Sequence, residues 1–314
     1  MKIVLVEPIG ISQDKLARLI GDYEKLGHTV VTYGDRPTED KTLIERCLDA
    51  DIMVVSNLPV SEEVINQCNN LKMISVAFTG VDHIPLALCK EKGIVVCNAA
   101  GYSTDSVAEL AIGLMISVLR KIAWGDNQTK KLLDKQGFLG TELKGKTLGI
   151  IGTGAIGLRV SELGKAFGCN VIAYSRTKKN ILGVSFVELD ELLSKSDIVS
   201  IHTPLNESTK SLINKDKLEL MKSAAILINT ARGPIVNNDA LADVLIDNKI
   251  AGAGIDVFDT EPPLSENYKL LSAPNTVLTP HVAYATKEAL GIRAKIVFDN
   301  IRKYLENNPQ NKIC

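Results

Sequence analysis

The sequence is poor in aromatic residues, in net charge and in long apolar runs. Phe, Trp and Tyr make up 4% of the 314 residues, so the core must be built mainly from Ile, Leu, Val and Ala. Lys and Arg number 36 against 37 Asp and Glu, and a formal charge of -1 creates no global field toward nucleic acid or anionic lipid. The longest apolar stretch, residues 110–119, is far shorter than the roughly 20 residues of a membrane-spanning helix. We therefore expect neither a nucleic-acid partner nor a membrane partner.

The six cysteines form no CxxC pair and show no zinc-ligand spacing. A chain of this length should hold about two domains, each large enough to fold without disulfide staples. The apolar run near the N-terminus is four residues long, too short for the core of a signal peptide. We expect a cytoplasmic protein with free thiols and no metal site.

Short runs rich in β-branched residues alternate with amphipathic segments, which is typical of βαβ units and parallel sheets. The first group of expected strands covers residues 3–6, 29–33, 52–55, 73–77 and 94–97. The second group covers residues 148–151, 171–174, 198–201, 226–228, 254–257 and 277–278. The sequence therefore predicts an α/β protein with two parallel sheets in succession and a last helix over residues 286–304.

The segment between these two groups has a different character. Ser106 to Glu109 has the pattern of a capping box, which predicts the start of an apolar helix that continues through residue 119. A polar and loosely patterned stretch, residues 121–141, follows it. A helix that is apolar nearly all round must be covered, either by its own chain or by a partner subunit. We favour a subunit interface, and therefore a homodimer.

A glycine fingerprint stands in the context that dinucleotide binding requires. Gly152, Gly154 and Gly157 form GxGxxG directly after an expected strand and at the start of an expected helix. Such glycines let the backbone approach a pyrophosphate, whose charge meets free N–H groups and the positive end of the helix dipole. The alternative is a glycine-rich turn that serves packing alone.

The residues after the next strand bear on the cofactor. An NAD-binding protein of this kind usually has an acidic residue there, which binds the adenosine ribose. This sequence has Ser175 and Arg176 instead, with Lys178 and Lys179 close behind. A hydroxyl and a guanidinium bind a 2′-phosphate that a carboxylate would repel. We predict NADP(H) as the preferred cofactor, with use of NAD(H) as the alternative.

Three later strands lead into residues suited to 2-oxo acid reduction: the first runs into Arg232, the second into Asp256 with Glu261 five residues further on, and the third into His281. Arg232, with its planar fork, would bind the substrate carboxylate and polarise the carbonyl group. His281 would be the acid for reduction and the base for oxidation. Glu261, hydrogen-bonded to the other ring nitrogen, would favour the imidazolium and raise its pKa. His202, which ends another strand, fits a cofactor-pocket or structural role better than that of a second acid.

Together these motifs resemble the D-isomer-specific 2-hydroxyacid dehydrogenase family over nearly the whole chain. The segments that carry the resemblance are the glycine loop, His202 to Leu205, Asn229 to Gly233, Asp256 to Phe258 with Glu261-Pro262, and Thr279 to His281. The resemblance implies a flavodoxin-like substrate domain (residues 1–98 and 285–314) and a Rossmann dinucleotide-binding domain (residues 99–284). It implies Arg232, Glu261 and His281 as the catalytic residues, and a dimer joined through residues 100–141.

The same resemblance implies binding residues. Thr79 and Gly80, with Arg232 and His281, would contact the substrate. The predicted cofactor contacts are Thr104, Gly152, Gly154, Ala155, Ile156, Gly157, Ser175, Arg176, Lys178, His202, Thr203, Pro204, Thr230, Ala231, Asp256 and Ala283. The Ser175-Arg176 pair makes the chain similar to NADPH-preferring glyoxylate and hydroxypyruvate reductases.

Residues 75–80 carry no Arg or Lys for a substrate phosphate, so we prefer glyoxylate or hydroxypyruvate as the oxo acid. Phosphoglycerate dehydrogenase activity is one alternative. A non-catalytic, nucleotide-sensing protein similar to a corepressor is another, although the Arg, Glu and His set favours turnover. Formate dehydrogenase is a third rival, but its relatives carry Gln at the position of Glu261.

Overall fold

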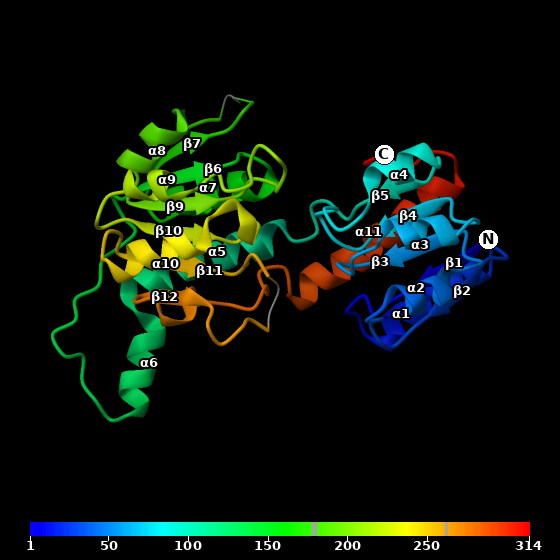
Figure 1. Cartoon of the computed structure of the whole chain (residues 1–314), viewed down its shortest axis with the longest axis horizontal. Helices are drawn as coiled ribbons and strands as arrows, with labels where there is room; N and C mark the ends of the chain where they lie inside the picture. The colour runs from blue at the N-terminus through cyan, green and yellow to red at the C-terminus, as the bar shows by residue number, and fades with distance from the viewer. Residues whose placement is uncertain (178–180, 261–262) are drawn as a thin grey trace. The chain divides into compact units, whose positions relative to one another are not determined.

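The computed structural model describes residues 1–177, 181–260 and 263–314 and divides the chain into two compact units. Unit 1 comprises Met1–Ser103 and Ala285–Cys314, and unit 2 comprises Thr104–Tyr284. The expected domain boundaries lie after residues 98 and 284. In the structure the chain passes from unit 1 to unit 2 after residue 103 and returns after residue 284. Each unit is built around one parallel sheet (Figure 1).

Unit 1 contains a five-stranded sheet in the order β2-β1-β3-β4-β5, and every pair of neighbours is parallel. Strands β3 and β4, in the interior of the sheet, are buried along their whole length, whereas the edge strand β2 is partly exposed. This order is that of a flavodoxin-like sheet. The strands are β1 (Lys2–Leu5), β2 (Thr29–Thr32), β3 (Ile52–Val55), β4 (Met73–Val76) and β5 (Val95–Cys97).

Five helices accompany this sheet. The chain returns to unit 1 through the last of them, α11, whose cap Thr286 accepts a hydrogen bond from the Ala289 N–H at 3.1 Å. The Ser75 hydroxyl on β4 donates to the Val297 carbonyl of α11 at 3.2 Å, which fixes the last helix against the sheet. The helices are α1 (Gln13–Glu24), α2 (Asp40–Cys47), α3 (Glu62–Gln67), α4 (Leu86–Glu91) and α11 (Lys287–Leu305).

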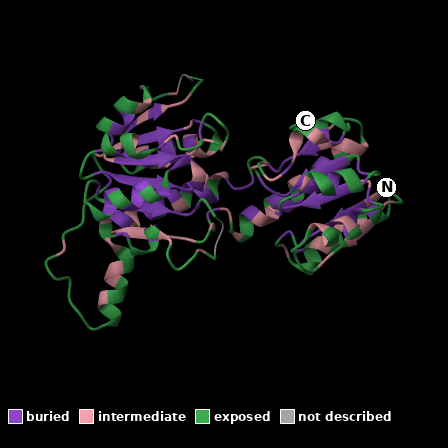
Figure 2. Ribbon diagram, viewed as in Figure 1, coloured by how far each residue is buried: buried purple, intermediate pink, exposed green. Residues whose placement is uncertain are grey.

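Unit 2 contains a seven-stranded parallel sheet in the order β12-β11-β10-β9-β6-β7-β8. The order reverses between β9 and β6, as in a Rossmann sheet with one added strand. Strands β6, β9, β10 and β11 are buried on both faces (Figure 2). The strands are β6 (Thr147–Ile151), β7 (Asn170–Tyr174), β8 (Ser185–Phe186), β9 (Ile198–Ile201), β10 (Ile226–Asn229), β11 (Gly252–Ile255) and β12 (Thr276–Leu278).

The predicted fold class is confirmed, and the differences are local. No sequence pattern predicted β8, which has two residues, or a helix inside the polar stretch 121–141. β11 ends two residues earlier than expected, so Asp256 follows the strand. The helices of unit 2 are α5 (Thr104–Arg120), α6 (Ile122–Lys130), α7 (Ala155–Ala166), α8 (Leu189–Lys195), α9 (Lys215–Glu219), α10 (Asn238–Ile246) and the 3-10 helices η1 (Gly233–Ile235) and η2 (Lys269–Ser272).

The apolar helix α5 corrects one expectation. It begins at Thr104, so Ser106 is not its cap but a buried residue of its first turns. Its apolar face lies in a core cluster shared with β6, β10 and α7, and Leu114 and Val118 lie against the glycines of β11. The chain itself therefore covers this helix, and its apolar composition does not require a partner subunit.

The six cysteines are free in the structure, as expected. Burial raises the pKa of the Cys89 and Cys97 thiols to about 11, so neither is a reactive thiolate near neutral pH. Across the described residues, no helix has the length and hydropathy needed to cross a membrane.

Candidate active site

The carboxyl-terminal edge of the unit 2 sheet gathers most of the residues singled out in the sequence. Because all seven strands are parallel, the loops that follow β12, β11, β10, β9, β6 and β7 leave the sheet along one edge. Ligands of open α/β sheets bind at this edge, next to the point where the strand order reverses. Here that point lies between β9 and β6.

The three glycines of the loop after β6 differ in how much room each would leave for a side chain. Gly152 has φ +96°, and a Cβ at this position would lie 2.7 Å from the carbonyl group of His202. A Cβ on Gly157 would lie 2.0 Å from the Gly152 carbonyl oxygen, so helix α7 can approach the loop only with glycine there. A Cβ on Gly154 would meet nothing within 4 Å. The middle glycine therefore borders open space where a pyrophosphate could approach the backbone.

The surroundings of this loop fit a dinucleotide. Gly154 caps α7 with extended backbone and no side-chain hydrogen bond, which leaves the first N–H groups of a 12-residue helix without capping partners. Two buried polar atoms on neighbouring strand ends, Thr230 Oγ1 and His202 Nδ1, have no hydrogen-bond partner among the described residues. Unsatisfied buried polar groups are costly, so these two atoms are candidate contacts for a bound polar ligand.

The described residues that directly follow β7, 175–177, lack an acidic side chain. Ser175 is half-buried and Arg176 is exposed. Tyr174 accepts a hydrogen bond from the Gly152 N–H at 2.8 Å, which holds the end of β7 beside the glycine loop. Lys178, the other expected cation, lies outside the described residues.

Arg232 is held after β10 by a buried asparagine. Asn229 is fully buried; its side-chain oxygen accepts from the Ala231 N–H at 3.0 Å, and its amide donates to the Arg232 carbonyl at 3.0 Å. The next residue, Gly233, leaves no room for a side chain, because a Cβ there would lie 1.8 Å from the Phe258 carbonyl. The Arg232 side chain is half-buried, and its Nη1 donates to the Ala231 carbonyl at 2.9 Å. The backbone around the guanidinium is therefore fixed from two strands.

Asp256, after β11, organises the loop that carries His281. Its Oδ1 accepts from the Thr279 hydroxyl at 2.6 Å and from the Val282 N–H at 2.9 Å, while Oδ2 accepts from the Ala283 N–H at 3.0 Å. Its backbone carbonyl accepts from the His281 N–H at 2.8 Å. Burial raises the pKa of this carboxyl, and the three hydrogen bonds and His281 act in the opposite direction. In the structure the Asp256 carboxylate holds residues 279–283, and the cofactor contact that the resemblance implies for Asp256 stays a prediction.

His281 itself adopts a strained backbone conformation. Its φ is +54°, a left-handed value that is uncommon for a residue other than glycine and that is often found at functional sites. The ring is half-buried and lies edge-on to Tyr284, with 5.6 Å between ring centroids. Glu261, the expected partner of His281, lies outside the described residues, as does Pro262.

His202 is unsuited to proton transfer. Its Nε2 lies 2.8 Å from the Ser200 hydroxyl, and burial lowers the pKa of the imidazole to about 3. The ring is therefore neutral at physiological pH, in keeping with a pocket residue rather than a second acid.

The other predicted contacts divide between the two units. Seven belong to unit 2, at the start of α5, at the start of α7 and after β9, β10 and β12: Thr104, Ala155, Ile156, Thr203, Pro204, Ala231 and Ala283. Pro204 is exposed beside Thr203. Thr79 and Gly80 follow β4 in unit 1, where the Thr79 carbonyl accepts from the Asn98 amide at 2.7 Å.

No sequence pattern assigned a role to two residues that position the site. Asn229 and Thr279 make no expected contact with a ligand, yet they hold the backbone on either side of the Asp256 loop. Their signal was a polar residue at the end of an otherwise apolar strand, which also marks many ordinary turns. Among the described residues, no group of His, Cys, Asp or Glu is arranged to hold a metal ion.

Comparisons with known proteins agree with this geometry. The family model described as "D-isomer specific 2-hydroxyacid dehydrogenase, NAD binding domain" matches residues 112–283. A hydroxypyruvate reductase from Thermotoga maritima is 43% identical over 255 residues, which cover 80% of this chain and 83% of the relative. One from Blautia hydrogenotrophica is 35% identical, with 92% and 93% covered.

The fold is also that of a solved relative. The structure of Bsp5, an acyclic imino acid reductase in complex with NADPH and D-Arg, superposes with a TM-score of 0.92 at 33% identity and covers both chains completely. The family match identifies the central segment as a nicotinamide-dinucleotide-binding domain. The chain therefore belongs to the D-isomer specific 2-hydroxyacid dehydrogenase family.

Proposed function

We propose that this protein is an NADP(H)-dependent reductase that converts a small 2-oxo acid, glyoxylate or hydroxypyruvate, to the D-2-hydroxy acid. The observation that carries the proposal is the order of the unit 2 sheet. It brings Arg232 after β10, Asp256 after β11 and His281 after β12 to one edge, on the same side of the sheet as the glycine loop. The hydroxypyruvate reductases among the relatives support the substrate class.

The roles follow from the chemistry of each group. A bound nicotinamide would supply the hydride, and Gly152, Gly154 and the first turn of α7 would hold its dinucleotide. Arg232 binds the substrate carboxylate through its guanidinium and polarises the carbonyl group. His281 donates a proton to the carbonyl oxygen as the alcohol forms, and Glu261 is its proposed carboxylate partner.

The preference for NADP(H) rests on the end of β7. Arg176 is exposed, Ser175 is half-buried, and no carboxylate stands there to accept a ribose hydroxyl. Arg176→Ala should weaken NADPH binding by about 1.5 to 3 kcal/mol and leave NADH binding almost unchanged. Isothermal titration with both cofactors measures this difference, and Lys165→Ala, a cation change elsewhere in unit 2, is the control. Equal losses for the two cofactors would contradict the assignment.

Steady-state kinetics provide the decisive test of the reaction. NADPH and NADH are each offered with glyoxylate, hydroxypyruvate, phosphohydroxypyruvate and pyruvate, with and without an amine. Oxidation of NADPH by glyoxylate or hydroxypyruvate alone supports the proposal. A requirement for the amine would indicate imine reduction, as in the name of Bsp5, and a preference for phosphohydroxypyruvate would indicate phosphoglycerate dehydrogenase activity. Cofactor binding without any turnover would favour a nucleotide-sensing role.

We also propose a homodimer that forms through residues 121–141 rather than through the buried face of α5. No residue of α6 is buried, and the loop after it exposes Leu132 (95%) and Leu139 (82%). This segment extends away from the sheet of unit 2 (Figure 1). Light scattering should give twice the mass of one chain, and the double variant Leu132→Ser/Leu139→Ser should give monomers. A monomeric wild-type protein would refute the proposal.

A further inference from the structure

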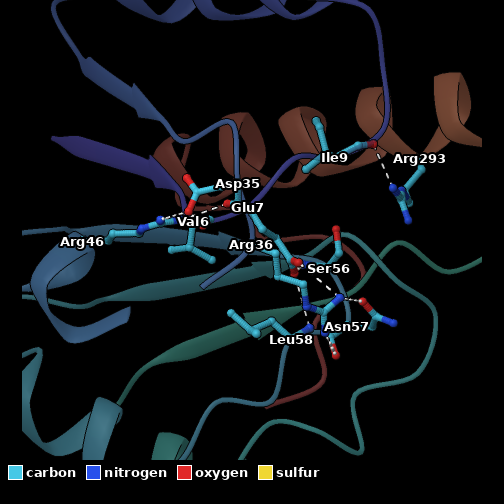
Figure 3. A network of polar contacts seen from close by, with 10 residues as sticks. All are labelled: Val6, Glu7, Ile9, Asp35, Arg36, Arg46, Ser56, Asn57, Leu58 and Arg293. Carbon is cyan, nitrogen blue, oxygen red and sulfur yellow. Dashed lines mark hydrogen bonds and ion pairs between the residues drawn. The ribbon is translucent and has the colours of Figure 1, made fainter. Parts of the chain in front are cut away.

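The sheet of unit 1 has its own switch point, and a buried carboxylate lies there. The strand order β2-β1-β3-β4-β5 reverses between β1 and β3, which is where a flavodoxin-like sheet binds ligands at its carboxyl edge. Glu7 follows β1 and Ser56 to Leu58 follow β3, so these residues face each other across that point (Figure 3). Thr79 and Gly80, the predicted substrate contacts, follow the next strand, β4.

Glu7 divides its two oxygens between two tasks. The side chain is 3% exposed, and Oε1 accepts from the Ser56 N–H at 2.8 Å and from the Leu58 N–H at 3.3 Å. Oε2 lies 3.4 Å from Nη1 of Arg36. One oxygen thus holds the backbone of the loop after β3, and the other neutralises the charge of the Arg36 guanidinium.

Arg36 comes from the segment after β2 and extends past the end of β1 to the β3 loop. Its Nη1 donates to the Asn57 side-chain oxygen at 2.7 Å, and its Nη2 donates to the Asn57 carbonyl at 3.3 Å. The side chain is 46% exposed. The guanidinium is therefore accessible to a ligand at this edge, but its charge is paired with the buried carboxylate of Glu7.

We propose that the Glu7–Arg36 pair determines substrate specificity: by keeping the carboxyl edge of unit 1 neutral, it selects 2-oxo acids with an uncharged third carbon over phosphorylated ones. This inference rests on the proposed function and adds the substrate class. A phosphate dianion that approached Arg36 would also approach the Glu7 carboxylate, and such a juxtaposition of like charges disfavours binding. A hydroxyl group meets no such repulsion and can hydrogen-bond to the same guanidinium or to Asn57.

A second ion pair nearby offers a matched control. Asp35, one residue before Arg36, pairs with Arg46 at 2.6 Å, and Arg46 also donates to the Val6 carbonyl at 2.7 Å and lies over the Tyr33 ring. Figure 3 draws both pairs. The Asp35 side chain is exposed and its carboxylate contacts Arg46 rather than Arg36. Asp35→Asn changes the charge of the chain by the same amount as Glu7→Gln, without releasing Arg36.

The test compares kcat/KM for hydroxypyruvate and for phosphohydroxypyruvate. Wild-type protein should favour hydroxypyruvate. Glu7→Gln retains an Oε1 acceptor for the two N–H groups and unpairs Arg36, so the preference should shift toward the phosphorylated substrate by at least about 10-fold, mainly through KM and less at high salt. Asp35→Asn should leave the ratio unchanged, and a similar shift in that variant would show a general charge effect and overturn the proposal.

Two further variants extend the test, and the first keeps it decisive if Glu7→Gln folds poorly. Arg36→Gln changes a half-exposed residue and should move the preference further toward hydroxypyruvate. The double variant Glu7→Gln/Arg36→Gln should lose the gain seen with Glu7→Gln, because that gain depends on the guanidinium. Active variants with an unchanged ratio would overturn this inference alone. A wild-type protein that reduces neither substrate would overturn the proposed function and, with it, this inference.

Discussion

Each unit places a buried carboxylate at the carboxyl edge of its sheet, and the two carboxylates are used differently. Asp256 in unit 2 is saturated by three neutral donors from residues 279–283, which carry His281. Glu7 in unit 1 receives two N–H groups on one oxygen and faces Arg36 with the other. The first carboxylate fixes the position of a reacting group, and the second also sets the charge of the edge. The two proposals therefore place the chemistry in unit 2 and the selection of substrates in unit 1.

The largest effect should come from removing the proton donor of unit 2. His281→Ala should lower kcat by about 100-fold or more, because general acid catalysis contributes about that much, while NADPH binding is retained. Stopped-flow turnover and cofactor titration on the same preparation separate the two effects. Arg232→Ala should instead impair KM and kcat together. Wild-type turnover by His281→Ala would exclude the imidazole from the mechanism. It would also contradict the proposal that the chemistry belongs to unit 2.

The two carboxylates themselves should respond unequally to amide substitution. Asp256→Asn must turn its NH2 group toward a backbone N–H in either orientation, so it should cost about 2 to 3 kcal/mol of stability and displace the His281 loop. Glu7→Gln keeps the shared acceptor and leaves a half-exposed guanidinium that water can solvate, so its cost should be about 1 kcal/mol or less. Calorimetric unfolding of both variants measures the difference. Equal losses would show that the second oxygen of Glu7 is as essential to folding as that of Asp256.

The sequence predicted the architecture well because its signals are local. Strands such as Ile52–Val55 and Ile198–Ile201 are continuous apolar runs, and their bounds were predicted to the residue. The two-residue strand β8 and helix α6 have no such pattern. A short strand at the edge of a sheet and an exposed helix can form without a periodic pattern of apolar residues. The covering of α5 depends on contacts with β10, β11 and α7 that are remote in sequence, so its composition alone indicated only that something must cover it.

The candidate site was predictable at the positions where the backbone conformation or a close contact allows only glycine. Gly152 and Gly157 are required by positive φ and by close approach, and both requirements leave a sequence motif. Asp256 was identified as a cofactor contact, which stays a prediction, whereas its hydrogen bonds to residues 279–283 became visible only in the structure. Glu7, Arg36 and Asn57 left no motif at all, since they come from three separate loops.

The smallest effect should appear as a pH dependence of stability that belongs to unit 2. The pKa of His202 is about 3 in the folded chain against an ordinary value near 6.5, so the unfolded chain binds more protons between these values. The free energy of unfolding should therefore fall on acidification through this window, by up to about 1.4 kcal/mol per pH unit from this group. The raised pKa of Asp256 acts in the opposite sense, because that group's contribution to stability is lost as pH rises through its folded pKa.

A variant is needed to isolate the histidine from this opposing group. His202→Gln keeps a polar atom near the Ser200 hydroxyl but does not titrate, so thermal unfolding between pH 6.5 and 4 should depend less steeply on pH than in the wild type. An identical slope in His202→Gln would mean that the imidazole is solvated in the folded chain. The carboxyl edge of unit 2 would then accommodate a charged side chain, as the carboxyl edge of unit 1 accommodates Arg36. The difference between the two edges would then depend only on how Asp256 and Glu7 are bonded.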